Sequence, residues 1–345
     1  MIIYTQNEHV YCAVVTCYDI IEVIKSSMDP LVIGLDIGGT RVKAALVDAN
    51  GTVLASRQAP TPDAINVFVE TIGDLVVELR REGPAAAAVG IGCKGIIDTS
   101  SSRVVTLPGT LHYLEGALLS ELLAPCLPAG CQVRADNDAR AALLGEMLWG
   151  AARGCNDVLM LTLGTGVGGA VLSGGHVLRG ASGVGGHIGH LTVDPDGVDC
   201  ICGNRGCLET VFSARAIESE AAAAILRGVA TSLRRADGVS PSCAEVFACA
   251  GCEDAVARHI VDRAIRVLAA GVAGLVHVFD PERVVIGGQI AEAGEALLEP
   301  LRREVQWRTR GLLRRDVTVV GSGLADPSGV LGAAAFALRG YSDLP

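Results

Sequence analysis

The chain has 345 residues, of which 50% are hydrophobic and only 3% are aromatic, and its formal net charge is −10. This length allows sizeable cores and fits two domains better than one. The charge argues against nucleic-acid binding, and no apolar run is long enough to span a membrane, so we expect neither partner. The sequence shows no secretory signal, so its cysteines indicate a cytoplasmic protein with a metal site before they indicate disulfides.

The first half of the chain begins with a segment unlike the rest. Residues 1–29 carry no recognisable motif, and we expect an N-terminal extension of uncertain origin there. The first clear strand is 31–36, and two further strands are joined at Asn50-Gly51, a strong hairpin signal. Apolar residues at helical spacing predict a helix over 64–82. Two buried strands and a helix complete this half: 86–93, 131–136 and 138–152.

The second half repeats this order. Glycine turns separate a group of strands within 157–178, and helices are expected afterwards. The remaining elements alternate: helices at 213–236 and 253–278, a strand at 284–288, a helix at 290–308, a strand at 317–323 and a helix at 329–338. Both halves open with a strand, a glycine-rich turn and a β-meander. This weak repeat predicts two similar α/β domains that face each other across a cleft.

Each half places a glycine-rich turn after an apolar strand. Asp36-Ile37-Gly38-Gly39-Thr40 ends the strand of the first half, and residues 163–169, LGTGVGG, end that of the second. Glycines let backbone amides approach an anion closely, and each turn adds a threonine hydroxyl. We interpret both as phosphate loops, against the alternative of simple turns. A dinucleotide loop at 164–169 is disfavoured, because a strand pattern follows where a helix should begin.

A group of metal-ligand residues lies in the middle of the second half. His190, Cys200, Cys202 and Cys207 are closely spaced, and glycines lie between the last two cysteines. Three thiolates and one imidazole can form a closed tetrahedral zinc site, which would be structural because no position stays open. The alternative is a set of buried cysteines beside an unrelated histidine.

Three polar residues, Asp136-Asn137-Asp138, join the strand at 131–136 to the following helix. Asp and Asn cap helix N-termini, so capping is one interpretation. A carboxylate in this place can also orient a hydroxyl during phosphoryl transfer, which needs orientation more than a strong base. The residues alone leave both interpretations open.

Six motifs in order carry a family resemblance. They are DIGGT (36–40), DND followed by Ala (136–139), LGTGVGG (163–169), GHIGH (186–190), CICGNRGCLE (200–209) and VVIGG (284–288). Together they resemble the ROK (repressor, open reading frame, kinase) family of sugar kinases, over nearly all of residues 31–336. The cysteine-rich motif is the most specific.

The resemblance implies two domains of the actin-like, ribonuclease-H-like ATPase fold. We expect a smaller α/β domain from residues 30–137 plus 329–345, and a larger one from 138–328 that holds the zinc motif. It also implies ATP and Mg²⁺, transfer of the γ-phosphoryl group to a hexose hydroxyl, usually the 6-OH, and a homodimer or tetramer. The expected function is therefore that of a glucokinase-like sugar kinase.

The resemblance also implies roles for individual residues. Asp138 is the expected base, and the expected sugar contacts are Asn137, His187, His190, Glu209 and Gly109. The residues expected to serve ATP or its phosphates are Asp36, Gly38, Gly39, Thr40, Lys43, Gly164, Thr165 and Gly166. Gly287 and Gly288 are expected near the adenosine.

Two positions depart from the family pattern. His187 stands where the family usually has a glutamate, and Gly109 stands where it has an asparagine. A carboxylate accepts two hydroxyls at once, whereas a neutral imidazole has one donor and one acceptor. Because a site built for one hydroxyl pattern rejects another, a modified or anionic sugar becomes an alternative to glucose. A neutral exchange compensated by neighbouring residues is the other interpretation of His187.

Two further functions are compatible with the family. A sugar-responsive repressor would carry an N-terminal helix-turn-helix domain, but only about 30 residues precede the first strand and they are β-rich. A sugar-binding protein without catalysis would not need Asp138 or the two phosphate loops. An active kinase is therefore the favoured interpretation.

Overall fold

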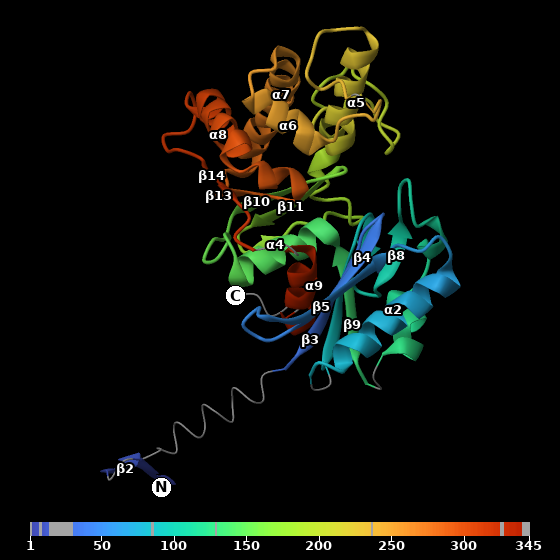
Figure 1. Cartoon of the computed structure of the whole chain (residues 1–345), viewed down its shortest axis with the longest axis vertical. Helices are drawn as coiled ribbons and strands as arrows, with labels where there is room; N and C mark the ends of the chain where they lie inside the picture. The colour runs from blue at the N-terminus through green and yellow to red at the C-terminus, as the bar shows by residue number, and fades with distance from the viewer. Residues whose placement is uncertain are drawn as a thin grey trace.

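The computed structural model describes residues 2–6, 9–13, 30–83, 86–127, 130–235, 237–324 and 328–339. Most of the expected N-terminal extension lies outside these residues. Its described part is an antiparallel hairpin of β1 (Ile2–Gln6) and β2 (His9–Ala13). From Leu31 onward the chain forms two lobes, one above the other in Figure 1.

The first lobe is built on a five-stranded sheet in the order β5-β4-β3-β6-β9. Its strands are β3 (Val32–Ile37), β4 (Arg41–Val47), β5 (Val53–Pro60), β6 (Ala88–Cys93) and β9 (Gln132–Asn137). β3, β4 and β5 are antiparallel, whereas β3, β6 and β9 run parallel. The helix α2 (Ile65–Arg80) packs on this sheet through its apolar stripe, which includes Phe68, Ile72 and Val76.

The second lobe repeats the same sheet, strand for strand, in the order β12-β11-β10-β13-β14. Its strands are β10 (Val158–Leu163), β11 (Val167–Ser173), β12 (His176–Val177), β13 (Arg283–Gly287) and β14 (Thr318–Gly321). β11 pairs antiparallel with β10 and β12, and β10, β13 and β14 are parallel. The expected internal repeat is confirmed, and so is the fold of two actin-like, ribonuclease-H-like α/β domains.

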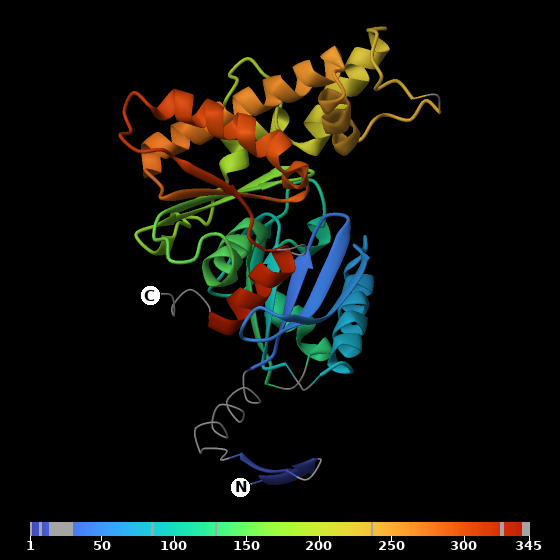
Figure 2. The same cartoon turned by 60° about the vertical axis from the view of Figure 1, so that its left-hand side comes forward.

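Four helices lie on the outer side of the second sheet in Figures 1 and 2, and their apolar residues share one cluster with those of its strands. They are α5 (Ala214–Leu226), α6 (Cys243–Gly251), α7 (Ala255–Phe279) and α8 (Glu295–Thr309). The expected helix over 213–236 is wrong beyond Leu226, because the chain turns at Gly228, whose φ is +76°. The helix α6 was not expected from the sequence.

Two helices lie between the sheets. α4 (Asp138–Trp149) follows the last strand of the first sheet, yet Ala142 and Leu143 pack in one cluster with residues of β10 and β11. α9 (Ser328–Arg339) follows the last strand of the second sheet and packs on β3 and β6 of the first. Gly34 and Gly90 permit this approach: a Cβ there would lie 2.2 Å from the carbonyl oxygen of Val330 and 1.8 Å from that of Ala333, respectively. The two helices therefore hold the lobes together.

Shorter elements complete the described chain. They are β7 (Ile96–Asp98), β8 (Arg103–Thr106), η1 (His112–Leu114), α3 (Leu119–Leu123), η2 (Ala124–Cys126), η3 (Ile188–His190), η4 (Leu208–Thr210) and η5 (Gln289–Ala293). None of the helices in the described ranges combines the length and apolar character needed to cross a bilayer.

Candidate active site

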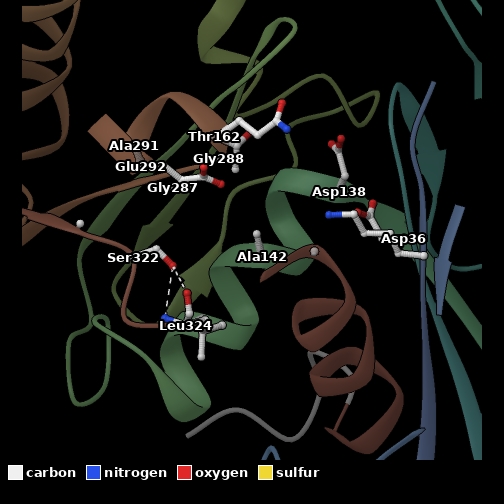
Figure 3. A pocket seen from close by; sticks show the side chains of 14 residues that line it. Asp36, Asp138, Ala142, Thr162, Gly287, Gly288, Ala291, Glu292, Ser322 and Leu324 are labelled. Atoms are coloured by element: carbon white, nitrogen blue, oxygen red, sulfur yellow. Dashed lines mark hydrogen bonds between the residues drawn. The ribbon is translucent and has the colours of Figure 1, made fainter. Parts of the chain in front are cut away.

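A cavity of about 360 Å³ is lined by residues of both lobes. Five residues expected at the site from the sequence line it: Asp36, Lys43, Asp138, Gly287 and Gly288. Figure 3 shows the carboxylates of Asp138 and Asp36 on one side of this cavity and the two glycines on the other. The cavity thus combines acidic side chains from one lobe with a glycine-rich turn from the other.

Asp36 and Lys43 lie directly opposite each other on the antiparallel strands β3 and β4. Their two strands are joined by a tight turn, in which the amide of Gly38 donates to the carbonyl of Arg41 at 3.1 Å. Gly38, Gly39 and Thr40 form this turn and do not line the cavity. The N-terminus of α9 comes close to the carboxylate, since a Cβ on Gly329 would lie 2.6 Å from Asp36 Oδ2.

Asn137 and Asp138, at the start of α4, have different contacts. Asn137 is the N-cap: its Oδ1 accepts from the amides of Ala139 and Arg140 at 3.0 and 3.3 Å, and its Nδ2 donates to the carbonyl of Gly95 at 3.0 Å. Only 6% of Asn137 is exposed, so little of it is accessible to a sugar. The carboxylate of Asp138 shares the amide of Ala139, which donates to its Oδ1 at 2.8 Å, and it also lines the cavity.

Burial raises the pKa of the Asp138 carboxyl above its usual value of 3.8. Opposing effects come from the backbone amide of Ala139 and from His187, Lys94 and Arg140, which all favour the ionised form. Lys94 was not expected at the site from the sequence. It follows β6 immediately, donates from Nζ to the carbonyl of Pro108 at 2.9 Å, and has a pKa lowered chiefly by burial.

His187 is held with one ring nitrogen bound and the other unpaired. Its Nδ1 lies 2.8 Å from the carbonyl oxygen of Val184. A carbonyl only accepts, so Nδ1 carries the hydrogen and Nε2 of the neutral ring is an acceptor. Nε2 is buried and has no hydrogen-bond partner among the described residues. Burial lowers the pKa of His187 below 6.5, which favours this neutral form at pH 7.

The four expected zinc ligands come together. The ligand atoms of His190, Cys200, Cys202 and Cys207 all lie within 4.8 Å of one another. The Sγ atoms of Cys202 and Cys207 are 3.7 Å apart, close to the edge of about 3.8 Å expected for a tetrahedron with Zn–S bonds of about 2.3 Å. His190 faces Cys200 Sγ with Nδ1, at 3.6 Å. The donor set and its spacing therefore fit a closed zinc site.

Glu209 lies against the glycine loop of the second lobe. Its Oε2 accepts from the amide of Val167 at 2.9 Å, and a Cβ on Gly166 would lie 2.2 Å from the same oxygen. Gly164 and Thr165 present carbonyls to the amide of Ala214 and to Arg215 Nε, at 2.9 and 3.2 Å. None of Gly164, Thr165 and Gly166 lines the cavity.

Gly109 lies where the first lobe meets the zinc loop. Its φ is +86°, and a Cβ at this position would lie 2.4 Å from Ile201 Cδ1. Ile201 stands between zinc-ligand candidates Cys200 and Cys202. A larger residue at position 109 would be strained by this φ, and the exposed end of the Ile201 side chain would have to move.

The cavity also contains residues that had no expected role from the sequence. They are Ala142, Thr162, Gln289, Ala291, Glu292, Gly321, Ser322, Leu324 and Gly329. The loop at 322–324 is anchored by the fully buried Glu146, which accepts from the Ser322 hydroxyl and, at 3.1 Å, from the amide of Gly323. Figure 3 shows the hydrogen bonds between Ser322 and Leu324 in this loop. No short motif marks these residues, because they come from strand ends, from η5, from the loop at 322–324 and from the helices α4 and α9.

Comparisons with known proteins place the chain among sugar kinases of one family. The model of the ROK family matches residues 32–339. A glucokinase from Thermotoga maritima is 37% identical over 311 residues, covering 88% of this chain and 95% of that protein. An N-acetylmannosamine kinase from Escherichia fergusonii is 36% identical, covering 77% of this chain and 86% of that protein. A ROK family glucokinase from Streptomyces griseus, solved with glucose and AMPPNP, superposes with a TM-score of 0.77 at 34% identity, covering 89% of this chain and 99% of that one.

Proposed function

Because this chain belongs to the ROK family, we propose that Asp138 is the base that orients a sugar hydroxyl toward the γ-phosphoryl group of ATP. The protein is an ATP-dependent kinase that phosphorylates a hexose or hexose derivative. One observation carries the role of Asp138: its carboxylate lines the same cavity as Asp36 and the Gly287-Gly288 turn. A carboxylate beside a phosphate site can orient a hydroxyl for in-line transfer of the phosphoryl group.

The nucleotide end of the cavity is assigned to Gly287 and Gly288, with the phosphates toward Asp36 and Lys43. Lys43 is a cation suited to phosphate oxygens. The carboxylate of Asp36 is an oxygen donor of the kind that Mg²⁺ prefers, and would hold the ion directly or through water. When bound, Mg²⁺ neutralises charge on the transferring phosphates. The turns at 38–40 and 164–166 remain predicted phosphate contacts.

Asp138 needs only a modest basicity for this chemistry. In a loose transition state the hydroxyl proton leaves late, so the carboxylate mainly orients the nucleophile. Burial, which raises the pKa of Asp138, makes its ionised form a better proton acceptor, while Lys94 favours the charge. The 6-OH is the acceptor hydroxyl that we propose.

The sugar contacts follow from the tautomers of two histidines. Their rings lie 6.5 Å apart and nearly parallel, at 14°. His187 offers Nε2 as an acceptor, because Nδ1 is bound to Val184. If zinc occupies Nδ1 of His190, the hydrogen of that ring is on Nε2, which then donates. We therefore propose that His187 accepts a hydrogen bond from one sugar hydroxyl and His190 donates one to another. Glu209 is a further proposed contact, and Asn137 and Gly109 remain predicted contacts.

Zinc binding by His190, Cys200, Cys202 and Cys207 is proposed on the donor set and its spacing. Its proposed task is to fix the loop beside the sugar site. A cytoplasmic location, a homodimer or tetramer, and the domain division at 30–137 plus 329–345 against 138–328 are further proposals from the family. The packing of α9 on the first sheet supports the division.

ADP release across a panel of hexoses, amino sugars and sugar acids tests the proposal. We expect release with at least one sugar, and its loss in Asp138→Asn. Asp262→Asn, an exposed change on α7, serves as the matched control and should be fully active. Binding of a sugar without ADP release would favour a regulator or a binding protein instead.

A further inference from the structure

We propose that Arg140 is a positioning residue: its buried guanidinium fixes the loop that carries His187 relative to Asp138, and so sets which sugar the enzyme accepts. The inference deepens the proposed function and rests on it, since it takes His187 as a sugar contact and Asp138 as the base. Arg140 acts through the loop and is assigned no contact with the sugar.

Arg140 is a fully buried charged side chain. Its Nε donates to Asp136 Oδ1 at 2.8 Å, and the two side chains are 1% and 0% exposed. Taking a guanidinium and a carboxylate out of water is costly, and such a pair often adds little to stability over apolar residues of the same volume. A buried pair of this kind therefore invites a role in fixing one particular arrangement.

The Arg140–Asp136 ion pair lies next to the proposed base, Asp138. Asp136 ends β9, and its Oδ1 also accepts from the amide of Asn137 at 2.6 Å. Arg140 lies in the first turn of α4, two residues after Asp138. The ion pair thus bridges the end of the strand and the first helical turn, on either side of the proposed base.

The other side of the pair is tied to the sugar loop, residues 179–187. Nη1 of Arg140 donates to the carbonyl of Gly183 at 2.9 Å and to that of Gly185 at 3.3 Å. Arg179 Nη2 lies 3.6 Å from Asp136 Oδ2, and the carbonyl of Arg179 accepts from the amide of Gly185 at 2.7 Å. The ion pair therefore holds this loop at both ends of its turn.

The loop segment that Arg140 binds directly orients the ring of His187. Val184 lies between the two carbonyls that Arg140 binds, and its own carbonyl is the partner of His187 Nδ1 at 2.8 Å and of the His187 amide at 3.2 Å. The loop closes only with glycine, because a Cβ on Gly185 would lie 2.6 Å from the carbonyl carbon of Arg179. If the hydrogen bonds from Arg140 to this loop are lost, the acceptor Nε2 of His187 loses its fixed direction.

Arg140→Lys tests this inference, because lysine keeps the charge but lacks the planar fork that reaches Asp136 and the loop carbonyls together. We expect the KM for the sugar to rise roughly 3- to 10-fold, as for loss of one aligned hydrogen bond, with the KM for ATP unchanged. In a His187→Ala background the same change should add less than about 2-fold, since the two residues act through one contact. Arg302→Lys is the matched control: Arg302 also joins a carboxylate, Glu295, to a backbone carbonyl, that of Val319, but on α8.

A measurement without turnover completes the test. Amide hydrogen exchange of the full-length protein should be faster in residues 179–190 of Arg140→Lys than in wild type, and unchanged there in Arg302→Lys. If Arg140→Lys does not fold, Asp136→Asn/Arg140→Met removes both charges together and should give the same faster exchange. The proposed role of Arg140 would be overturned if Arg140→Lys raised the sugar KM equally in the wild-type and His187→Ala backgrounds. Unchanged amide exchange in residues 179–190 would also overturn it. If the wild type turned over no sugar, the proposed function would be overturned instead. The exchange measurement does not depend on turnover, so it tests the role of Arg140 separately.

Discussion

Asn137 and Asp138 are adjacent in the chain and both accept from the amide of Ala139, but only Asp138 lines the cavity. The side chain of Asn137 satisfies the first amides of α4, and the carboxylate of Asp138 lines the cavity between the lobes. The sequence alone leaves capping and catalysis as alternative roles for these residues. In the structure Asn137 is the N-cap, whereas the carboxylate of Asp138 accepts from one helix amide and is also positioned for the proposed chemistry.

Asp138→Asn should lower kcat by about 10²- to 10⁴-fold, the usual contribution of a general base. The KM for ATP should change little, because Gly287 and Gly288 are unaffected. Steady-state kinetics with a coupled assay measures both constants, with Asp262→Asn as control. A variant that retains most of its kcat would remove Asp138 from the mechanism.

The same substitution should affect stability with a definite pH dependence. Burial raises the pKa of Asp138 above 3.8, so the folded state binds more protons than the unfolded state between the two pKa values. Its contribution to stability therefore falls as pH rises through this window. Asp138→Asn should be more stable than wild type near pH 7, and this advantage should shrink toward about pH 4. Urea denaturation at several pH values measures it; an advantage largest in acid would contradict burial as the cause of the raised pKa.

His187→Glu should change sugar preference more than catalytic rate. A carboxylate replaces the single acceptor Nε2 with two acceptor oxygens, so a different set of hydroxyls fits. The ratio of kcat/KM between glucose and the best substrate of the wild type should shift toward glucose by roughly 10-fold, about 1.4 kcal/mol. His176→Glu, at an exposed position on β12, is the control. Identical ratios in both variants would mean that His187 does not read the sugar.

Freshly purified protein should contain one zinc ion per chain, and Cys207→Ser should lose it. Loss of a structural metal belongs to the changes that destabilise by about 4 kcal/mol or more. Metal analysis and thermal unfolding measure the two effects. Cys252→Ser alters an exposed cysteine outside the ligand cluster and should keep both zinc and stability. Folded, zinc-free wild type would refute the metal site.

Gly90→Ala should strongly destabilise the protein. Its Cβ would lie 1.8 Å from the carbonyl oxygen of Ala333, so α9 would have to move off the first sheet. Overpacking of this kind costs about 1 to 3 kcal/mol or more. Gly274→Ala on the exposed side of α7, where a Cβ meets no atom within 4 Å, should instead stabilise by about 0.5 to 1 kcal/mol. Equal urea midpoints for the two variants would contradict the close approach of α9.

Much of the fold could be predicted because its strands are continuous apolar runs bounded by glycine turns. β3, β6 and β10 are of this kind, and the Asn50-Gly51 turn fixes the β4–β5 hairpin. The missed helix α6 did have a sequence signal, the capping box of Ser242 and Glu245. Where α4 and α9 pack could not be predicted, since each helix crosses to the sheet of the other lobe and no local pattern encodes this.

The site was predictable where its chemistry is local in sequence. The zinc ligands Cys200, Cys202 and Cys207 are close together in the chain, Asp36 lies near the end of β3, and Asp138 follows β9. Lys94 and Arg140 were missed because their importance depends on burial beside residues that are distant in sequence. Lys94 is near Asp138 only through the pairing of β6 with β9.

The position of a bound sugar relative to Asp138 tests the central claim most directly. A crystal structure of the enzyme with its best sugar and a non-hydrolysable ATP analogue should place the acceptor hydroxyl about 2.6 to 3.2 Å from the Asp138 carboxylate, in line with the γ-phosphorus. A sugar bound elsewhere, with Asp138 in contact with no hydroxyl, would contradict the proposed mechanism.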